Sequence, residues 1–245
     1  MCTLEKRGSL FILTLIGNDE HRLNPTLIDS IRDALARVRS QSSSSSSALI
    51  TTAVGKFFSN GYDLNWATNH SGSIDTTVDR LNLMSFNLRS LFRDLISLPM
   101  PTIAAVNGHA SAGGFILALS HDYILMRKDR GYLYMSELDI SLKIPAWFVK
   151  LLKNRIASPA VHREIVLKAA KFTATAALEK GIIESSHDGV EETVAAAVKL
   201  GDSLVKRGWD GNVYCEIRKV MMSDVLAASE YDETLEDAVK IASKI

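Results

Sequence analysis

The chain has 245 residues, 47% of them hydrophobic, which is enough apolar material for a buried core. Lys plus Arg and Asp plus Glu number 28 each, so no overall field favours nucleic acid or an anionic membrane, and neither is an expected partner. The two cysteines, Cys2 and Cys215, form neither a disulfide framework nor a metal-ligand cluster, and no stretch reaches the roughly 20 apolar residues of a membrane span. No secretory signal is recognised at the start, so we expect a globular protein of a reducing compartment.

The first part of the chain alternates predicted strands and helices. Asn24 caps a helix that opens with Pro25, and Pro99 ends a later one. Two polar stretches, residues 42–47 and 68–77, are predicted to be a surface loop and a mobile connection. The predicted strands are 10–15, 48–54, 102–106, 123–126 and 132–135, and the predicted helices are 25–39, 78–97 and 112–120. This order indicates an α/β core of repeated ββα-like units.

The last third is predicted to be mostly helical. From about Ile144 onward the strand signals fade. Helices are expected at 159–170, 173–180, 190–207, 212–228 and 232–244. Several have broad apolar faces that a small appendage cannot bury alone, so we expect packing on the core or on a neighbouring subunit. The organisation predicted is a core over residues 1–190 with the active site, and a helical oligomerisation region over residues 191–245.

Two glycine-bearing loops are the strongest functional signal. One covers residues 58–64 and the other residues 106–114; each follows a short apolar strand, and the second opens a helix. Such loops present backbone N–H groups where negative charge can develop. The pair therefore predicts an oxyanion hole for chemistry that forms an anion next to a carbonyl.

The sequence FSNGYDL at 58–64 resembles the FSxGxDL loop of the crotonase (enoyl-CoA hydratase/isomerase) superfamily, and PTIAAVNG at 101–108 is similar to its strand before the glycine-rich turn. The resemblance covers nearly the whole chain. It implies a crotonase-type ββα spiral core with a helical C-terminal region. Within the superfamily, residues 135–140 and the chain ending most resemble plant peroxisomal Δ3,Δ2-enoyl-CoA isomerases.

The resemblance also implies the site residues. The oxyanion donors are the amides of Tyr62 and Gly113, where glycine allows close approach of a thioester. Coenzyme A enters as part of the substrate, so no separate cofactor and no metal are expected. The residues implied in binding it are Arg22, Ser59, Asn60, Gly61, Tyr62, Asp63, Leu64 and Gly113. Asp63 is expected to shape its loop rather than to react.

Position 116 separates the possible reactions. Hydratases of the superfamily use two acidic residues; the first corresponds to Ile116 and the second to Glu137. One carboxylate suffices for a 1,3-proton shift, so the pattern favours isomerisation of 3-enoyl-CoA to trans-2-enoyl-CoA in fatty-acid β-oxidation. The alternatives are a non-catalytic acyl-CoA-binding homologue, in which Glu137 is idle, and a hydratase or thioester hydrolase that activates water with another group.

Glu137 needs an apolar pocket that raises its pKa toward neutrality. Residues near it in sequence that could supply one are Leu138, Ile140, Ile144, Trp147 and Phe148. Asp139 is expected to point elsewhere. His109 could be a base, but a packing role is the favoured interpretation.

The ending Ser243-Lys244-Ile245 differs from the peroxisomal Ser-Lys-Leu address only at its last residue. We therefore expect recognition by the peroxisomal import receptor and a peroxisomal location. As in the family, a homotrimer or a dimer of trimers is expected, and the sequence leaves open which of the two forms.

The sequence also leaves open the acyl chain length of the substrate and whether a cis or a trans 3-enoyl group is preferred.

Overall fold

A six-stranded sheet forms the base of the molecule. The computed structural model of the chain describes residues 1–18, 20–42, 46–68 and 74–230. The strand order is β1-β2-β3-β5-β7-β9, with β1 antiparallel to β2 and every other neighbouring pair parallel. The strands are β1 (Cys2–Arg7), β2 (Leu10–Leu15), β3 (Ala48–Ala53), β5 (Thr102–Val106), β7 (Tyr123–Arg127) and β9 (Ser185–His187).

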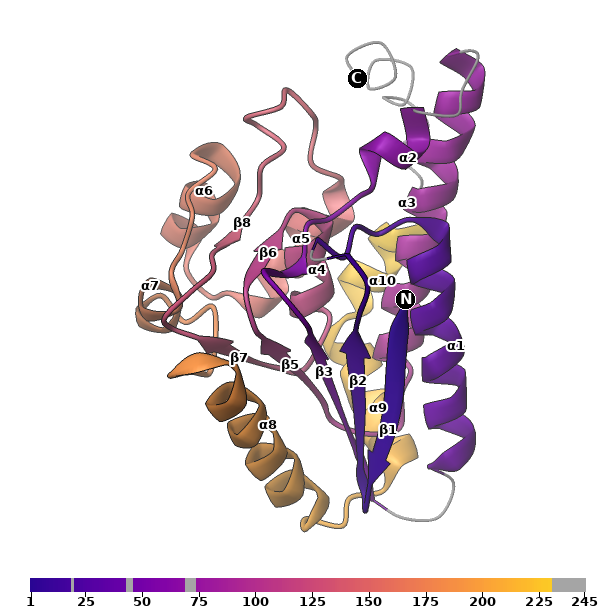
Figure 1. The fold of residues 1–245 in the computed structure, drawn as a ribbon, viewed down its shortest axis with the longest axis vertical. Coiled ribbons are helices and arrows are strands. Elements are labelled where there is room, and N and C mark those ends of the chain that lie inside the picture. Colours follow the sequence, from indigo (N-terminus) through magenta and orange to yellow (C-terminus); the bar gives the residue numbers. More distant parts are fainter. Residues whose placement is uncertain (19, 43–45, 69–73, 231–245) are drawn as a thin grey trace.

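A second, three-stranded parallel sheet stands beyond the ends of the first (Figure 1). It contains β4 (Phe57–Ser59), β6 (His109–Ser111) and β8 (Leu133–Tyr134). Three units, β3-β4-α2, β5-β6-α4 and β7-β8-α5, place one strand in the large sheet and the next in the small sheet before a helix follows, which is the predicted ββα repeat. Both glycine-bearing loops leave strands of the small sheet.

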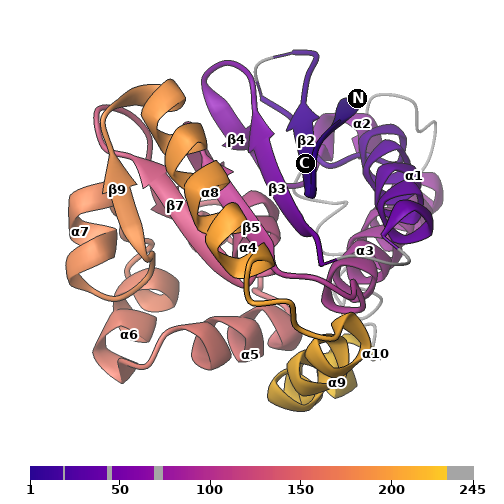
Figure 2. The ribbon, with the colours of Figure 1, turned by 90° about the horizontal axis from the view of Figure 1, so that it is seen from below.

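Helices cover both faces of the large sheet. Figure 2 shows α8 on one face, with α4 and α5 on the other. The same division follows from alternation along the strands: Leu10, Ile50 and Ile103 pack in the cluster under α8, whereas Phe11, Leu49 and Ala104 belong to the main core. The helices are α1 (Pro25–Gln41), α2 (Leu64–Thr68), α3 (Ile74–Ile96), α4 (Gly113–Leu119), α5 (Ala146–Arg155), α6 (Pro159–Leu167), α7 (Ala174–Glu179), α8 (Gly189–Val205), α9 (Gly211–Met221) and α10 (Ser223–Glu230).

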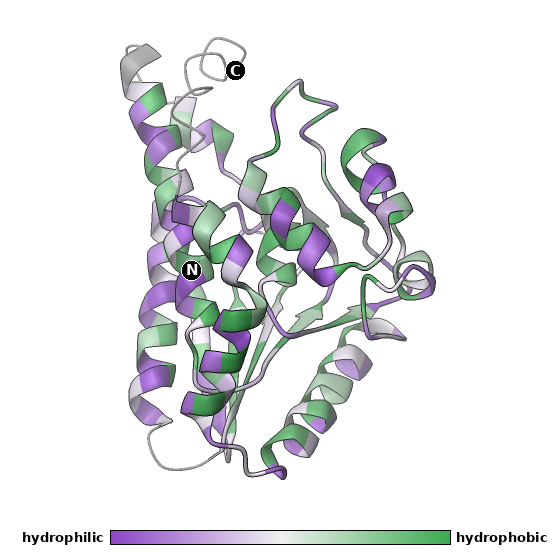
Figure 3. Cartoon of the chain, turned by 180° about the vertical axis from the view of Figure 1, so that it is seen from behind, coloured by the Kyte–Doolittle hydropathy of each residue, from purple (hydrophilic) through white to green (hydrophobic). Residues whose placement is uncertain are grey.

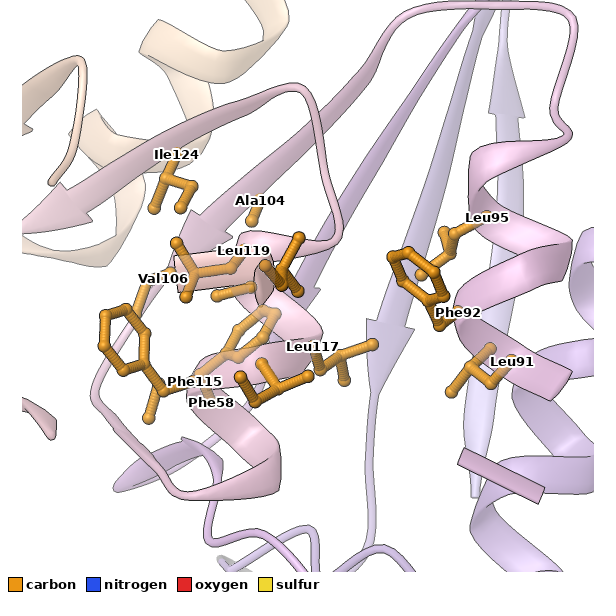
Figure 4. Packing of buried hydrophobic residues seen from close by; sticks show 14 of the residues in the cluster. Phe58, Leu91, Phe92, Leu95, Ala104, Val106, Phe115, Leu117, Leu119 and Ile124 are labelled. Atoms are coloured by element: carbon orange, nitrogen blue, oxygen red, sulfur yellow. The ribbon is translucent and has the colours of Figure 1, made fainter. Parts of the chain in front are cut away.

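The main core lies between the large sheet and the helices. The strands are mostly apolar in Figure 3, while the long helices carry alternating polar and apolar bands, as helices with one buried face do. Helix α4 runs through the middle of this core: all seven of its residues are buried. In Figure 4, Leu117 and Leu119 of α4 lie among Val106 and Ile124 of the sheet, with Phe92 of α3 opposite. The helix that opens with Gly113 is therefore held by packing over its whole length.

Several predicted boundaries were wrong. Residues 74–77, assigned to a mobile connection, are the start of α3, and Thr68 ends α2. The single helix predicted over 212–228 is two helices that break at Met222. The short strands β4, β6 and β9 were not predicted, because three residues show no periodicity that a sequence pattern can detect. The ten-residue helix α5 was not predicted either. The helix predicted over 232–244 lies outside the described residues.

The proposed division at residue 190 falls in the first turn of α8, whose apolar face packs on β3, β5 and β7. Within the part of the chain that the structure describes, no helix is both long and apolar enough to cross a membrane.

Candidate active site

Three segments that are distant in sequence meet at Gly61. The amide of Leu23 donates to the Gly61 carbonyl at 2.7 Å, which ties the segment before α1 to the first glycine-bearing loop. Gly61 has φ +71°, and a Cβ there would lie 3.1 Å from the Gly113 nitrogen. At Gly114, a Cβ would lie 2.1 Å from the Ser59 carbonyl oxygen. The two loops therefore abut backbone to backbone, an approach that only glycine permits.

The two predicted oxyanion donors lie on these abutting loops. Gly113 is the first residue of α4, so its amide has no acceptor within the helix and lies at the positive end of the helix dipole. The preceding Ala112 has φ +50°, a costly conformation that points to a functional constraint. Tyr62 follows Gly61 directly and forms a bridge with Leu23. The fold thus brings together both residues that the sequence assigned to the oxyanion hole.

Pairing between β6 and β8 brings Glu137 to the same place. The Ala112 amide donates to the Tyr134 carbonyl at 2.9 Å, and the hydroxyl oxygens of Ser111 and Ser136 lie 3.4 Å apart. Glu137 follows at the start of a turn that is closed by the Leu142 amide, which donates to the Glu137 carbonyl at 2.8 Å. The register of two short strands therefore sets the distance between Glu137 and the start of α4.

The Glu137 side chain is buried, and one of its carboxylate oxygens has no hydrogen-bond partner in the part of the chain that the structure describes, which is unusual for a carboxylate. It is 7% exposed, and Oε2 has no hydrogen-bond partner among the described residues. Burial raises its pKa to about 7, against the opposing effect of the Ser136 and Glu137 amides. A carboxyl group near neutrality can both take up and return a proton at physiological pH.

The surroundings of Glu137 differ in part from the sequence expectation. Trp147 and Phe148 are buried in the main core, and Ile144 packs against it. Leu138 and Ile140 are 54% and 49% exposed, so these two form little of the pocket. Asp139 is exposed, as expected of a residue that does not share the site.

Three of the residues predicted to bind coenzyme A, all in the first glycine-bearing loop, are tied to the segment before α1. Ser59 is fully buried and donates its hydroxyl to the His21 carbonyl at 2.8 Å, while the Asn60 amide donates to the Glu20 carbonyl. Asp63 accepts from the Asn24 side chain at 2.9 Å and from the Trp66 amide at 3.0 Å, which fits its expected role in shaping the loop.

Two further predicted residues lie at the ends of this region. Leu64 is the first residue of α2 and is partly buried. Arg22 forms an ion pair with Glu20, so part of its charge is already neutralised. It stays the local cation of this segment, and its guanidinium is partly exposed.

His109 lies between the rings of Phe57 and Tyr132, at centroid distances of 4.9 and 5.5 Å. Burial, with smaller contributions from nearby Lys56, Arg130 and Lys171, lowers its pKa. These contacts fit the packing role. No cluster of three or more His, Cys, Asp or Glu side chains able to hold a metal occurs in the described ranges.

His21 is buried, and its contact with β4 was not predicted from the sequence. It has φ +44°, and its Nδ1 donates to the Phe57 carbonyl at 3.0 Å, so it joins the segment before α1 to β4. No sequence signal marked it, because the contact spans 36 residues.

Comparison with known proteins places this geometry in a family. The model of the enoyl-CoA hydratase/isomerase family matches residues 8–238. The chain belongs to the enoyl-CoA hydratase/isomerase family. It is 56% identical to enoyl-CoA delta isomerase 1, peroxisomal, of Arabidopsis thaliana over 92% of this chain and 91% of that protein, and 49% identical to enoyl-CoA delta isomerase 2, peroxisomal, over 92% and 93%.

The crotonase fold itself is also seen in solved structures. Human mitochondrial delta3-delta2-enoyl-CoA isomerase superposes with a TM-score of 0.84 at 18% identity, covering 99% of this chain and 92% of that one. The predicted α/β fold with a ββα spiral and a helical C-terminal region is thereby confirmed.

Because the chain belongs to this family, the residue at position 116 can be compared with the acid that is expected there in a hydratase. Ile116 is fully buried on α4, where a hydratase of this family is expected to carry an acid. Among the residues that the structure describes, Glu137 is the only buried acidic one. Among the described acidic residues, Glu137 is therefore the one whose burial suits it to proton transfer.

Proposed function

We propose that this protein is a Δ3,Δ2-enoyl-CoA isomerase that works with a single carboxylate. The observation that carries the proposal is the pairing of a buried Glu137, with its pKa near 7, and a buried apolar Ile116. Relatives that are 49% and 56% identical bear the name enoyl-CoA delta isomerase, which supports the same reaction. The pathway that we propose for it is the β-oxidation of unsaturated acyl chains.

The mechanism begins with the thioester carbonyl between the amides of Tyr62 and Gly113. Ionised Glu137 removes a proton from C2 of the 3-enoyl group, and the C3–C4 double bond is conjugated with the enolate that forms. The two amides stabilise the enolate oxygen, an effect worth roughly 100- to 1000-fold in rate per donor. Protonated Glu137 then returns the proton to C4, which leaves the double bond between C2 and C3.

This reaction is balanced without a cofactor. One proton moves from C2 to C4, no electrons leave the substrate, and coenzyme A is carried by the substrate itself. We propose that the segment from Ser59 to Leu64 and Gly113 lines the pantetheine and that Arg22 lies near the phosphates. The partial exposure of Arg22 supports this role.

The test is an absorbance assay at the conjugated enoyl-thioester band with a 3-enoyl-CoA. Wild type should raise the absorbance, Glu137→Gln should not, and Asp139→Asn should match wild type because Asp139 is exposed. Loss of the band from added 2-enoyl-CoA would show hydration instead. Unchanged absorbance in every variant, with acyl-CoA still bound, would establish a binding protein.

We propose a peroxisomal location. Two relatives carry the word peroxisomal in their names. Residues 243–245, which we expect to bind the import receptor, lie outside the described residues. Removing these three residues from a fluorescent fusion should release it from peroxisomes, and an unchanged distribution would contradict the proposal.

We also propose that the chain self-associates through α9, as a homotrimer or a dimer of trimers. Val213, Ile217 and Val220 are 58%, 57% and 75% exposed, and their spacing puts them on one face of the helix. A cavity of about 550 Å³ beside α9 is lined by Trp209, Val213 and Ile217 among others. An exposed apolar face of this kind is typical of a protein interface.

A further inference from the structure

Each of the last four carbonyl groups of α4, from Ile116 to Leu119, accepts a hydrogen bond. Because α4 is buried, each of its last carbonyls needs a donor from the protein. The Ser120 hydroxyl donates to Ile116 O at 2.8 Å, and the His121 amide donates to Ala118 O at 3.1 Å. Two side chains complete the set, His121 and Arg155, and each connects the helix to a different part of the fold.

His121 joins α4 to the large sheet. It is 1% exposed; its Nδ1–H donates to Leu117 O at 2.9 Å, and Nε2 accepts from the Thr51 hydroxyl of β3 at 2.8 Å. Burial lowers its pKa to about 4, so the ring is neutral at physiological pH. This contact fixes the helix relative to β3.

Arg155 joins α4 to α5. It is the last residue of α5, and its Nε donates to Leu119 O, the carbonyl of the last residue of α4, at 3.0 Å. Its side chain is only 15% exposed, and Nη2 lies 3.9 Å from Asp122 Oδ1 without a hydrogen-bond partner among the described residues. Asp122 is already bonded by the Arg218 guanidinium at 2.8 and 2.6 Å. The direct contact of Arg155 is therefore with α4 rather than with that carboxylate.

The two helices that Arg155 connects both lead to the active site. Helix α4 has seven residues, so its ends are only about 10 Å apart, and its first residue is Gly113. The start of α4 has no side-chain cap and follows the strained Ala112. Helix α5 begins nine residues after Glu137 and packs against α4. Because α4 is this short, a displacement of its C-terminal end also displaces the Gly113 amide at its start.

We propose that Arg155 is a positioning residue for the isomerase reaction: by holding Leu119 O, it keeps the Gly113 amide in line with the enolate oxygen that Glu137 generates. The cationic side chain at a helix C-terminus also stabilises the helix dipole. The inference rests on the proposed function. It assigns a role in transition-state geometry to a side chain that does not reach the substrate.

The experiment compares Arg155→Met, which removes the donor and the charge, with Arg155→Lys, which keeps a charged donor of different shape. Exposed Arg163 on α6 provides the control Arg163→Met. For each folded variant, kcat and KM are measured with a 3-enoyl-CoA. Affinities are measured for a saturated acyl-CoA and for a 3-ketoacyl-CoA, whose enolate mimics the intermediate. The oligomeric state is checked, because Arg155 also lines the cavity beside α9.

Arg155→Met should lower kcat at least tenfold with KM changed less than threefold. It should weaken 3-ketoacyl-CoA binding by a similar factor and leave saturated acyl-CoA binding intact. Arg155→Lys should lose about threefold in kcat at unchanged KM, and Arg163→Met should match wild type. If Arg155→Met does not fold, the kcat of Arg155→Lys alone tests the positioning role of Arg155.

Wild-type kcat in a folded Arg155→Met or in Arg155→Lys overturns the inference. So does an equal loss of affinity for both acyl-CoA ligands, or a loss of kcat that follows dissociation of the oligomer. If wild type has no isomerase activity, the proposed function fails instead, and the selective loss of 3-ketoacyl-CoA binding still decides the role of Arg155.

Discussion

Gly61 and Gly113 are in direct backbone contact: a Cβ on Gly61 would lie 3.1 Å from the Gly113 nitrogen and 2.9 Å from the Ser111 carbonyl oxygen. The proposed oxyanion donors are the amide of Tyr62, which follows Gly61, and the amide of Gly113 itself. Their relative position thus depends on the absence of a side chain at Gly61, which makes it testable by a small substitution.

Gly61→Ala should lower kcat/KM roughly 100-fold, the cost of misplacing one oxyanion donor, as measured in the absorbance assay. Gly181→Ala is the matched control: Gly181 also has positive φ, +66°, but open space around its Cβ. Both variants share the backbone strain, of about 1 kcal/mol, and both should lose stability. Equal activity in the two would show that the loop contact does not matter to the reaction.

The activity should depend on pH through Glu137. The group must be ionised to take the C2 proton, and its pKa is raised to about 7. We therefore expect kcat/KM to rise with pH to a plateau, with an apparent pKa near 7. A profile that is flat between pH 5 and 8 would contradict a buried carboxyl base.

Glu137→Gln should stabilise the protein at high pH. The carboxyl has a higher pKa in the folded state, about 7, than its ordinary value of 4.5, so ionisation opposes folding as pH rises through this window. Above pH 7 the cost approaches about 3 kcal/mol. Denaturant unfolding should show Glu137→Gln to be more stable than wild type at pH 8 and the advantage to vanish below pH 4.5. An advantage independent of pH would mean that ionisation is not its cause.

Neighbouring glycines should respond differently to alanine. A Cβ at Gly114 would lie 2.1 Å from the Ser59 carbonyl oxygen, whereas one at Gly113 meets only the Leu23 and Leu88 side chains at 3.5 Å. Gly114→Ala should therefore lose several kcal/mol of stability or fail to fold, and Gly113→Ala should fold with a Tm close to that of wild type. Thermal unfolding of the pair measures this, and comparable Tm values would show that the loops are not tightly packed.

Ile217→Asp should disrupt self-association. Ile217 is 57% exposed on the apolar face of α9, where a charge would have to be desolvated in an interface. Light scattering with size exclusion should show a smaller species than wild type, while Lys199→Asp, on the exposed side of α8, should leave the size unchanged. If Ile217→Asp keeps the wild-type size, this face of α9 is not the interface.

How far the sequence predicts this site depends on the range of the interaction involved. The apolar strands and the amphipathic helices α1 and α3 were predictable from local periodicity, although α3 begins four residues before the predicted helix. The short strands β4 and β6 were not, because each exists only through pairing with a distant segment. Arg155 gave no signal, since its contact with Leu119 spans 36 residues.

Residue identities and local patterns were determined by the sequence alone: Ile116 in place of an acid, glycines at two loop tips, and a carboxylate at position 137. Only the tertiary structure decided that Glu137 is buried with a raised pKa and that Gly61 touches Gly113. The physical reason is that desolvation and close backbone approach depend on which distant segments pack together. Those partners are selected by the pairing of β6 with β8 and of β4 with β6, not by the residues beside each site.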